Sequence, residues 1–330
     1  MKKSLPLVLN LTLLLLVVSG CNYRAENYVF GTYYSVQIKG EQSNKNGKAI
    51  DEMFIELDNA LSTSKEESDV YKINSAKAGE SIPVSNYTIE LFQTSKELYD
   101  LSNGAFNVAS FPLTELWKFS PLTYTGIATE IPSKGQIDSI LPYCSPDLFV
   151  IDDNAKTITK LHDNAKLDFG AIAKGFAADK AKSLITKADD AIIDVGRTFC
   201  VIGSIDLMVA SPRNNDYVAQ ATLSNQSVAT SGDYERYYVV NNQRYHHILA
   251  KNGYPANIFE EDPIQSVTII GESATIADAL STTVFILGYE QSLQILSHYN
   301  YSALIITAKG YYTVGETVFE INDKNLTKLN

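Results

Sequence analysis

Apolar side chains recur along this chain at two spacings, one typical of helices and one typical of strands. Ile50, Met53, Phe54, Leu57 and Leu61 fall at helical intervals, which predicts an amphipathic helix. The helical spacing also predicts helices over residues 86–102, 131–141, 273–287 and 292–299, and a short helical turn that ends near residue 74. Gly288 should close the helix over residues 273–287.

Runs rich in β-branched and aromatic residues predict the strands. They cover residues 29–38, 191–195, 201–209, 219–223, 237–240, 267–270, 304–307 and 311–319, with a hairpin over 149–161. No internal repeat or long linker interrupts them. We therefore expect an α+β fold of mixed sheets with packed helices, forming a single compact unit over residues 29–330, with residues 21–28 as a tether.

The first 20 residues have the pattern of a secretory signal. Lys2 and Lys3 precede an apolar run over residues 5–18, and small residues lead directly into Cys21. This arrangement resembles a bacterial lipobox, in which the cysteine becomes the lipidated N-terminus; the alternative is a signal anchor with an incidental cysteine. We expect a lipoprotein of the cell envelope, anchored at Cys21 and facing the periplasm or the outside. The choice between inner and outer membrane stays open.

The charge of the mature chain excludes one class of partner. Removal of the leader takes away two lysines and no acid, so the formal net charge falls from −11 to −13. An acidic chain without a basic patch argues against nucleic-acid binding and against binding of anionic lipid through the protein's own charge. Cys144 and Cys200 remain after processing, either as a disulfide or as buried apolar residues.

The stretch over residues 167–181, LDFGAIAKGFAADKA, combines charge with small side chains. We interpret residues 167–170 as a strand end that turns on Gly170, with a helix beginning near Ala171. Asp168 and Lys174 then flank a helix start whose free N–H groups favour anions. The alternative is an ordinary strand–helix junction with Asp168 as a cap and Lys174 in solvent.

Three further segments carry polar chemistry. Residues 230–233, TSGD, place hydroxyls and a carboxylate in what we predict is a turn. His247 is a candidate base, although adjacent histidines on a strand point to opposite faces, so only one of His246 and His247 should face a site. Asp278 and Thr282 share a helix face, and their oxygens are hard ligands suited to Mg²⁺. The alternative for this pair is hydroxyls bonded back to the helix carbonyls. No HxxxH pair indicates a histidine zinc site.

Taken in order, these segments resemble the ApbE-type flavin transferases, the FAD:protein FMN transferase family. The motifs that carry the resemblance are Phe30-Gly31-Thr32, Leu61-Ser62-Thr63 through Asn74, Gly104-Ala105-Phe106, Pro112-Leu113 with Leu116-Trp117, residues 168–175, residues 229–234, His247-Ile248, Gly253-Tyr254-Pro255 and residues 277–282.

The resemblance implies a Mg²⁺-dependent enzyme that transfers FMN from FAD to an exposed Thr or Ser of an acceptor flavoprotein and releases AMP. It implies that Asp278 and Thr282 bind the metal through their side chains, and that Ala171 and Ser281 bind it through backbone oxygens. His247 corresponds to the base that deprotonates the acceptor hydroxyl. The positions that correspond to FAD contacts are Phe30, Ala105, Phe106, Asn107, Asp168 and Lys174, together with Ile248 or Leu249.

Four positions depart from the family pattern. Ser64 stands in the FAD-binding set where members commonly carry an aromatic residue, and Asn107 replaces an aspartate. Arg197 replaces a second glycine after Gly196, and Ala250 stands in a turn that is one residue shorter. These departures leave two alternatives to transfer: a Mg²⁺-dependent FAD pyrophosphatase that yields FMN and AMP, and a non-catalytic flavin-binding lipoprotein.

Overall fold

An antiparallel sheet of eight strands forms the centre of the computed structural model, which describes residues 22–120 and 122–329. The predicted leader and the lipidation site at Cys21 lie outside the described residues. Adjacent strands of the sheet are β1 (Tyr23–Val29), β2 (Thr32–Gly40), β6 (Ala188–Val195), β7 (Thr198–Ile202), β10 (Ser227–Gly232), β13 (Ile264–Gly271), β14 (Ser302–Thr307) and β15 (Tyr311–Val314).

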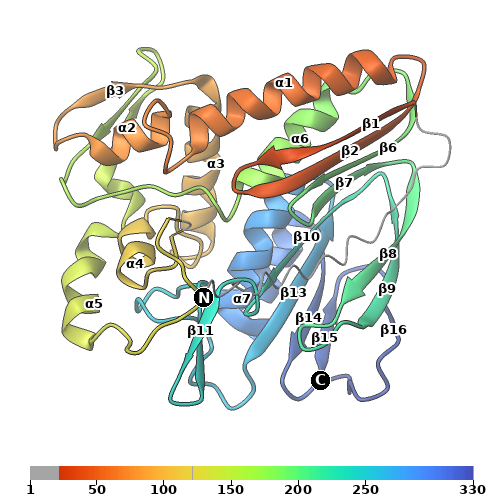
Figure 1. The fold of residues 1–330 in the computed structure, drawn as a ribbon. Helices are drawn as coiled ribbons and strands as arrows, with labels where there is room; N and C mark the ends of the chain where they lie inside the picture. The colour runs from red at the N-terminus through yellow and green to blue at the C-terminus, as the bar shows by residue number, and fades with distance from the viewer. Residues whose placement is uncertain (1–21, 121, 330) are drawn as a thin grey trace, which may run out of the picture.

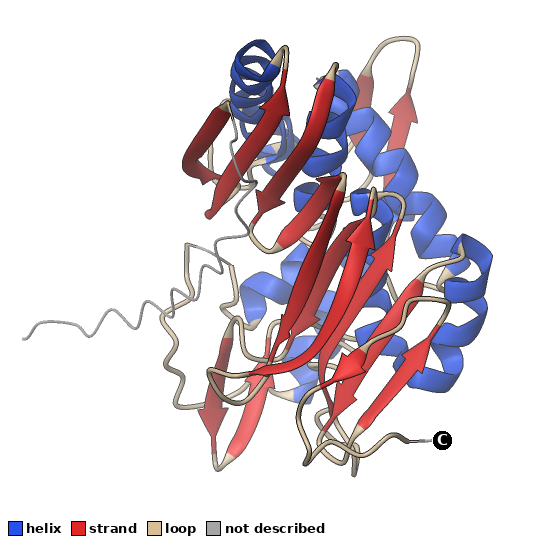
Figure 2. Ribbon diagram, turned by 90° about the vertical axis from the view of Figure 1, so that its right-hand side faces the viewer, coloured by secondary structure: helices blue, strands red, loops and turns tan. Residues whose placement is uncertain are grey.

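Helices cover one face of this sheet and a smaller sheet covers part of the other (Figures 1 and 2). The covering helices include α1 (Ser43–Leu61), α6 (Ala173–Leu184) and α7 (Ala274–Tyr299). The smaller sheet consists of β8 (Ser204–Ala210), β9 (Tyr217–Ser224) and β16 (Glu320–Ile321). Strand alternation explains the two cores: Ile305 of β14 packs in the helical core, whereas Leu304 and Ile306 pack against the smaller sheet.

A second group of elements lies beside this layered body (Figure 1). It contains α2 (Asp69–Ser75), α3 (Asn86–Leu101), α4 (Phe111–Leu116), α5 (Lys134–Ile140), the 3₁₀ turns 141–143 and 146–148, the sheet β3 (Ser81–Pro83), β5 (Thr157–Lys160) and β4 (Phe149–Asp152), and the hairpin of β11 (Tyr237–Val240) and β12 (Gln243–His246). Trp117, Phe119, Tyr238 and Tyr245 form a stacked aromatic cluster under the β11–β12 hairpin. The predicted α+β fold is confirmed.

Two predicted elements were wrong near the N-terminus and the central stretch. The expected tether over residues 21–28 instead contributes β1, because Tyr23 and Tyr34 both donate hydrogen bonds to Asp51 of α1 and hold a polar edge strand in place. Residues 167–169 are extended coil rather than a strand end. The Asp168 N–H donates to Val108 of a loop, and α6 begins at Ala173 rather than Ala171.

One further prediction needs correction. Residues 230–232 lie on β10 rather than in a turn, because β13 pairs with them throughout. The predicted break between the helices over 273–287 and 292–299 is confirmed: α7 is two helical segments that meet at a kink, where Gly288 has non-helical backbone with φ at 80°. Cys144 and Cys200 are both free.

Within the described ranges, no helix combines the length and the apolar character needed to cross a membrane.

Candidate active site

Close packing of two helices creates the centre of the site. A side chain at Gly175 of α6 would place its Cβ 2.1 Å from the Ala274 oxygen and 2.8 Å from the Asp278 Cβ of α7. Glycine at this position therefore lets the two helices approach backbone to backbone. The approach allows the Gly175 N–H, at the start of α6, to donate to Asp278 Oδ2 at 3.0 Å.

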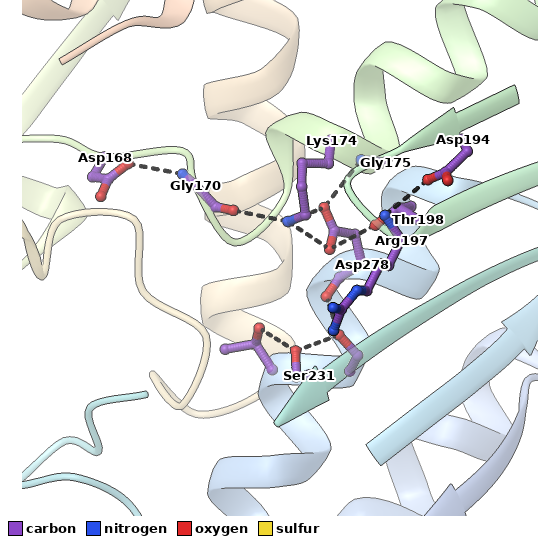
Figure 3. A network of polar contacts seen from close by, with 11 residues as sticks. Asp168, Gly170, Lys174, Gly175, Asp194, Arg197, Thr198, Ser231 and Asp278 are labelled. Carbon is purple, nitrogen blue, oxygen red and sulfur yellow. Dashed lines mark hydrogen bonds and ion pairs between the residues drawn. The ribbon is translucent and has the colours of Figure 1, made fainter. Parts of the chain in front are cut away.

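Asp278 is a buried carboxylate that accepts hydrogen bonds from Lys174, Gly175 and Thr198 (Figure 3). Lys174 Nζ lies 3.2 Å from both of its oxygens, and the Thr198 hydroxyl lies 3.4 Å from Oδ1. Lys174 also donates to the Gly170 carbonyl at 3.2 Å. Removing a carboxylate from water is costly unless charge and hydrogen bonds compensate for the lost hydration, and these contacts supply both.

A chain of hydroxyl groups begins at the backbone carbonyl of Asp278. The Ser281 hydroxyl donates to the Asp278 carbonyl at 2.7 Å, so it accepts from the Ser231 hydroxyl, which is also 2.7 Å away. Thr282 Oγ1 lies 3.2 Å from Ser231 Oγ. Ser281 thus follows the alternative of bonding back to its own helix, whereas Thr282 contacts a neighbouring strand and remains on the face of Asp278.

The loop that carries Asn107 is joined to Asp168. The Asp168 N–H donates to Val108 O at 2.8 Å, and Asp168 Oδ1 accepts from the Gly170 N–H at 2.8 Å. The Asn107 amide donates to Cys144 O at 2.9 Å and its oxygen accepts from the Ala109 N–H. An ionised aspartate could not donate to the Cys144 carbonyl, so this hydrogen bond is a structural reason for asparagine at position 107.

Asp58 links the Phe30 turn to the loop that contains Ser64. Its carboxylate accepts from the Phe30 N–H at 3.1 Å and pairs with Lys65 at 2.6 Å. Phe30 is half-buried, with φ at 53°, in the two-residue turn between β1 and β2. Ser64 is exposed and its hydroxyl lies 3.1 Å from the Ser62 hydroxyl. These two predicted flavin-contacting positions are therefore neighbours.

The turn between β6 and β7 lies against Lys174. Gly196 donates its N–H to Tyr33 O at 3.0 Å, and a Cβ at Gly196 would lie 3.2 Å from Lys174 Cδ. Arg197 adopts a φ of 71° and pairs with Glu235 at 2.8 Å. Its side chain is exposed.

The two adjacent histidines occupy different environments, as predicted. His246 is buried, contacts the Phe285 ring, and places Nε2 3.0 Å from Ala256 O. His247 is half-buried, and its Nδ1 lies 3.3 Å from the Arg236 carbonyl. A carbonyl only accepts, so Nδ1 carries the proton and Nε2 keeps a free lone pair. Burial, and then the nearby Arg236 charge, hold the pKa of His247 well below its usual value.

Several predicted contact residues have buried side chains. Ala105, Phe106 and Ile248 are at most 5% exposed and pack in the protein interior, so a flavin could meet Phe106 only through its backbone. Leu249 is half-buried and its backbone pairs with Pro255. Ala171 is half-buried in the turn before α6.

A continuous set of polar contacts, which runs through Gly170, Ser281 and Ser231, connects Asp168, Lys174, Asp278 and Thr282. No signal in the sequence indicated Thr198, and Gly175 and Ser231 stood in motifs without a role of their own. Only the pairing of β7 and β10 and the contact between α6 and α7 reveal them. A cavity of about 380 Å³ lies elsewhere, beside β8 and β9, and none of the predicted site residues lines it.

The oxygen donors of α7 are of the kind that a hard divalent cation prefers. Asp278 and Thr282 stand one helical turn apart on the same face of α7, and carboxylate and hydroxyl oxygens suit Mg²⁺ better than a soft metal. Among residues 22–120 and 122–329, no cluster of three or more His, Cys, Asp or Glu side chains forms an alternative centre.

Comparison with known proteins identifies the family of this chain. The ApbE family matches residues 30–305. A FAD:protein FMN transferase from Klebsiella pneumoniae is 30% identical and covers 72% of this chain and 73% of its own. The Treponema pallidum protein of that name is 27% identical over 84% and 82% of the two chains. The ApbE protein of Thermotoga maritima superposes with a TM-score of 0.78 at 29% identity, covering 91% of this chain and 97% of its own.

The fold and the site thus define an ApbE-like protein. The match over most of the chain shows that it belongs to the ApbE family, which confirms the resemblance found in the sequence.

Proposed function

We propose that this protein is a Mg²⁺-dependent FAD:protein FMN transferase, which moves FMN from FAD to a Thr or Ser hydroxyl of an acceptor flavoprotein and releases AMP. Membership of the ApbE family and the name shared by its curated relatives support the transfer of a flavin. The observation that carries the proposal is the buried Asp278 carboxylate, which the Lys174 ammonium and the Gly175 N–H hold at the start of α6.

The reaction balances as a phosphoryl substitution. The acceptor hydroxyl oxygen forms a bond to the phosphorus on the FMN side of the pyrophosphate. The bond from that phosphorus to the bridging oxygen breaks, and AMP leaves with the bridging oxygen and its electron pair. The hydroxyl proton passes to His247 Nε2, which the Arg236 carbonyl leaves free by holding the Nδ1 proton.

The residues around Asp278 explain how an acidic protein binds a pyrophosphate. Bound Mg²⁺ would neutralise part of the phosphate charge. The side chains of Asp278 and Thr282 would hold it, with backbone oxygens of Ala171 and Ser281. Lys174 adds a second cation on the ligand side, because its side chain is 25% exposed while that of Asp278 is 5% exposed.

The first experiment incubates the soluble chain that begins after Cys21 with FAD, Mg²⁺ and a candidate acceptor domain. AMP release and protein-bound flavin fluorescence are measured together. We expect both signals, and we expect His247→Ala and Asp278→Ala to lose them by about 10²–10⁴-fold, the range for a missing base or charge stabiliser. His298→Ala, which changes an exposed histidine, is the matched control and should retain them.

The alternatives give different products. Release of AMP with free FMN, and no labelled acceptor for any hydroxyl-bearing partner, would favour a pyrophosphatase that uses water. Intact bound FAD would contradict both enzymes and leave a flavin-binding protein. The exposed Ser64, where an aromatic ring would cover the flavin, is the feature that keeps the pyrophosphatase in consideration.

We also propose that residues 1–20 are removed and that Cys21 carries lipid, which anchors the protein in the cell envelope facing the periplasm or the outside. The leader pattern supports this assignment. Mass spectrometry of the membrane form should show the lipid on Cys21. Cys21→Ala should remove it and release the chain from membranes.

A further inference from the structure

We propose that one end of the molecule lies directly on the membrane surface and contacts anionic phospholipid headgroups. This anchor end consists of Asn22, residues 39–48 and residues 186–190. The inference rests on lipidation of Cys21, but it does not depend on which flavin reaction the protein catalyses.

No flexible tether separates the folded domain from Cys21. The Asn22 N–H donates to Ile38 O at 3.0 Å, and Asn22 Oδ1 accepts from the Gly40 N–H at 3.1 Å. Tyr23 pairs with Ile38 in the sheet and its ring covers Gly47 of α1. One peptide step of about 3.8 Å therefore joins a lipidated Cys21 to a residue fixed on the sheet. A chain anchored so closely holds its anchor end against the headgroups.

The anchor end carries a small positive charge although the mature protein is strongly acidic, so the expectation against lipid binding, which came from the net charge of the whole chain, does not apply to this end. Its charged residues are Lys39, Glu41, Lys45, Lys48, Lys187, Asp189 and Asp190, which sum to +1. Lys39 and Lys187 pair loosely with Asp190 and Glu41, at 3.8 and 3.4 Å. Within the ranges that the structure describes, Lys45 and Lys48 are exposed and form no ion pair. Juxtamembrane lysines of this kind are attracted to anionic lipid.

The start of α1 adds to this preference. The first turn of the helix contains no acidic residue, and the N-cap Gln42 makes no side-chain capping bond. Lys45 and Lys48 at a helix start oppose the helix dipole, so they are poor choices for helix stability. Uncapped N–H groups beside two lysines favour a phosphate group, which a lipid headgroup supplies at this position.

The anchor end and the candidate site lie at opposite ends of the same elements (Figure 1). Strand β1 runs for seven residues, about 23 Å, from the anchor end to the Phe30 turn. Helix α1 runs beside it for 19 residues, about 28 Å, from the anchor end to Asp58 and the Ser64 loop. The site therefore faces away from the bilayer, and an acceptor must present its hydroxyl that far above the surface.

The test places a fluorophore on Asn44→Cys at the anchor end or on Glu66→Cys beyond the far end of α1, in the full lipidated chain. Cys144 and Cys200 should label poorly, because burial raises the pKa of both thiols. In vesicles of phosphatidylethanolamine and phosphatidylglycerol that carry a headgroup quencher, we expect several-fold stronger quenching at residue 44 than at residue 66.

Two variants distinguish the effect of the short connection to Cys21 from the effect of the lysine charges. A flexible Gly/Ser linker of about 20 residues between Cys21 and Asn22 should abolish most of the difference. Lys45→Glu with Lys48→Glu should weaken quenching at residue 44 in anionic vesicles but not in phosphatidylcholine. Lys134→Glu with Lys156→Glu, which changes the same charge at exposed sites outside the anchor end, is the matched control and should leave it unchanged.

Equal quenching at the two positions, or stronger quenching at residue 66, would overturn the proposal. A mature chain without lipid on Cys21 would overturn it too. Flavin transfer to a soluble acceptor in detergent is measured on the same samples. This measurement distinguishes failure of the proposed orientation from failure of the proposed transferase activity.

Discussion

Neighbouring residues of the same type acquire different chemistry from their surroundings, and His246 and His247 are the clearest case. His246 turns inward against Phe285 and belongs to the packing of the domain. In His247 the Arg236 carbonyl fixes Nδ1, and the charge of Lys174 in the candidate site acts on the imidazole. Both imidazoles have lowered pKa values because burial disfavours the charged form, yet the consequence is catalytic for one and structural for the other.

The first prediction concerns the pH dependence of transfer. A base must be neutral to accept a proton, and the pKa of His247 lies well below 6.5. The acid limb of kcat/KM should therefore fall below pH 6.5. Arg236→Gln should move it upward, because it removes a positive charge while keeping a donor to Phe119 O. Arg24→Gln, on the edge strand β1, should leave the limb in place. A wild-type limb at or above pH 6.5 would argue against His247 as the base.

The second prediction concerns stability. Burial lowers the pKa of His246 to about 4 in the folded state, so between pH 6.5 and 4 the unfolded chain binds more protons. The contribution of His246 to the free energy of unfolding is therefore complete above pH 6.5, the pKa in the unfolded chain. It is lost as the pH falls toward 4, by about 3 kcal/mol in total. Urea unfolding near pH 7 and near pH 4.5 should show the loss.

His246→Gln should reduce that loss, because the amide keeps a donor to Ala256 O but does not titrate. Asp194 has the opposite effect on the pH dependence of stability, because burial raises its pKa to about 6 and the folded state then binds the extra proton. For that reason the comparison is the difference between wild type and variant. An identical pH slope in the two proteins would contradict the assignment.

At the scale of elements, short turns position the site. The turn of Gly196 and Arg197 joins β6 to β7, and Asp194 Oδ1 accepts its Arg197 N–H at 2.8 Å. The turn packs on Thr32 of β2 and on Lys174 of α6. Both of its central residues have positive φ, the conformation of the two-residue hairpin turns that match strand twist.

The third prediction compares the two positions of this turn. Gly196→Ala should destabilise by about 1–3 kcal/mol, because φ is 58° and the new Cβ would lie 2.7 Å from Thr32 Cγ2. It should also reduce activity by displacing Lys174. Arg197→Gly should be neutral or stabilising by up to about 1 kcal/mol. Glycine adopts the left-handed backbone without the steric cost that arginine has there, and this gain exceeds the stability lost with the exposed ion pair to Glu235. Denaturant midpoints would measure both changes, and similar losses in the two variants would contradict this account.

At the scale of the whole molecule, the candidate site forms at one end of the central sheet. The Phe30 turn, the Gly196 turn and the end of β10 meet there, and α6 and α7 bring Lys174 and Asp278 to the same place. These residues are up to about 250 positions apart in the chain. A ligand that contacts them ties together elements that otherwise separate on unfolding.

The fourth prediction follows from this linkage. Mg²⁺ with FAD should raise the unfolding temperature by several degrees, since a ligand at a hundred times its Kd stabilises by about 2.7 kcal/mol. Asp278→Asn should lose the shift, because its amide neither carries the charge for the cation nor pairs with Lys174. Asp216→Asn, which changes an exposed aspartate, should keep it. A full shift in Asp278→Asn would exclude Asp278 from the binding site.

The sequence by itself determined the amphipathic helices, most of the strands and the α+β class, because hydrophobic periodicity is a local property that burial then enforces. Helix α1 and helix α3 follow their predicted patterns closely. The order of polar motifs was also sufficient to indicate the family. Local patterns failed where long-range pairing decided the outcome, as for the polar β1, the extended segment at Asp168 and the TSGD residues on β10.

Only the tertiary structure decided how the site is assembled. The partners of Asp278 come from α6 and β7, so its burial, its ion pair with Lys174 and its contact with Thr198 depend on packing between distant segments. The proton on His247 Nδ1 depends on a backbone carbonyl across a hairpin. Sequence spacing specifies which side chains share an element, but desolvation and pairing energies arise only when elements meet, and those energies set the chemistry of this site.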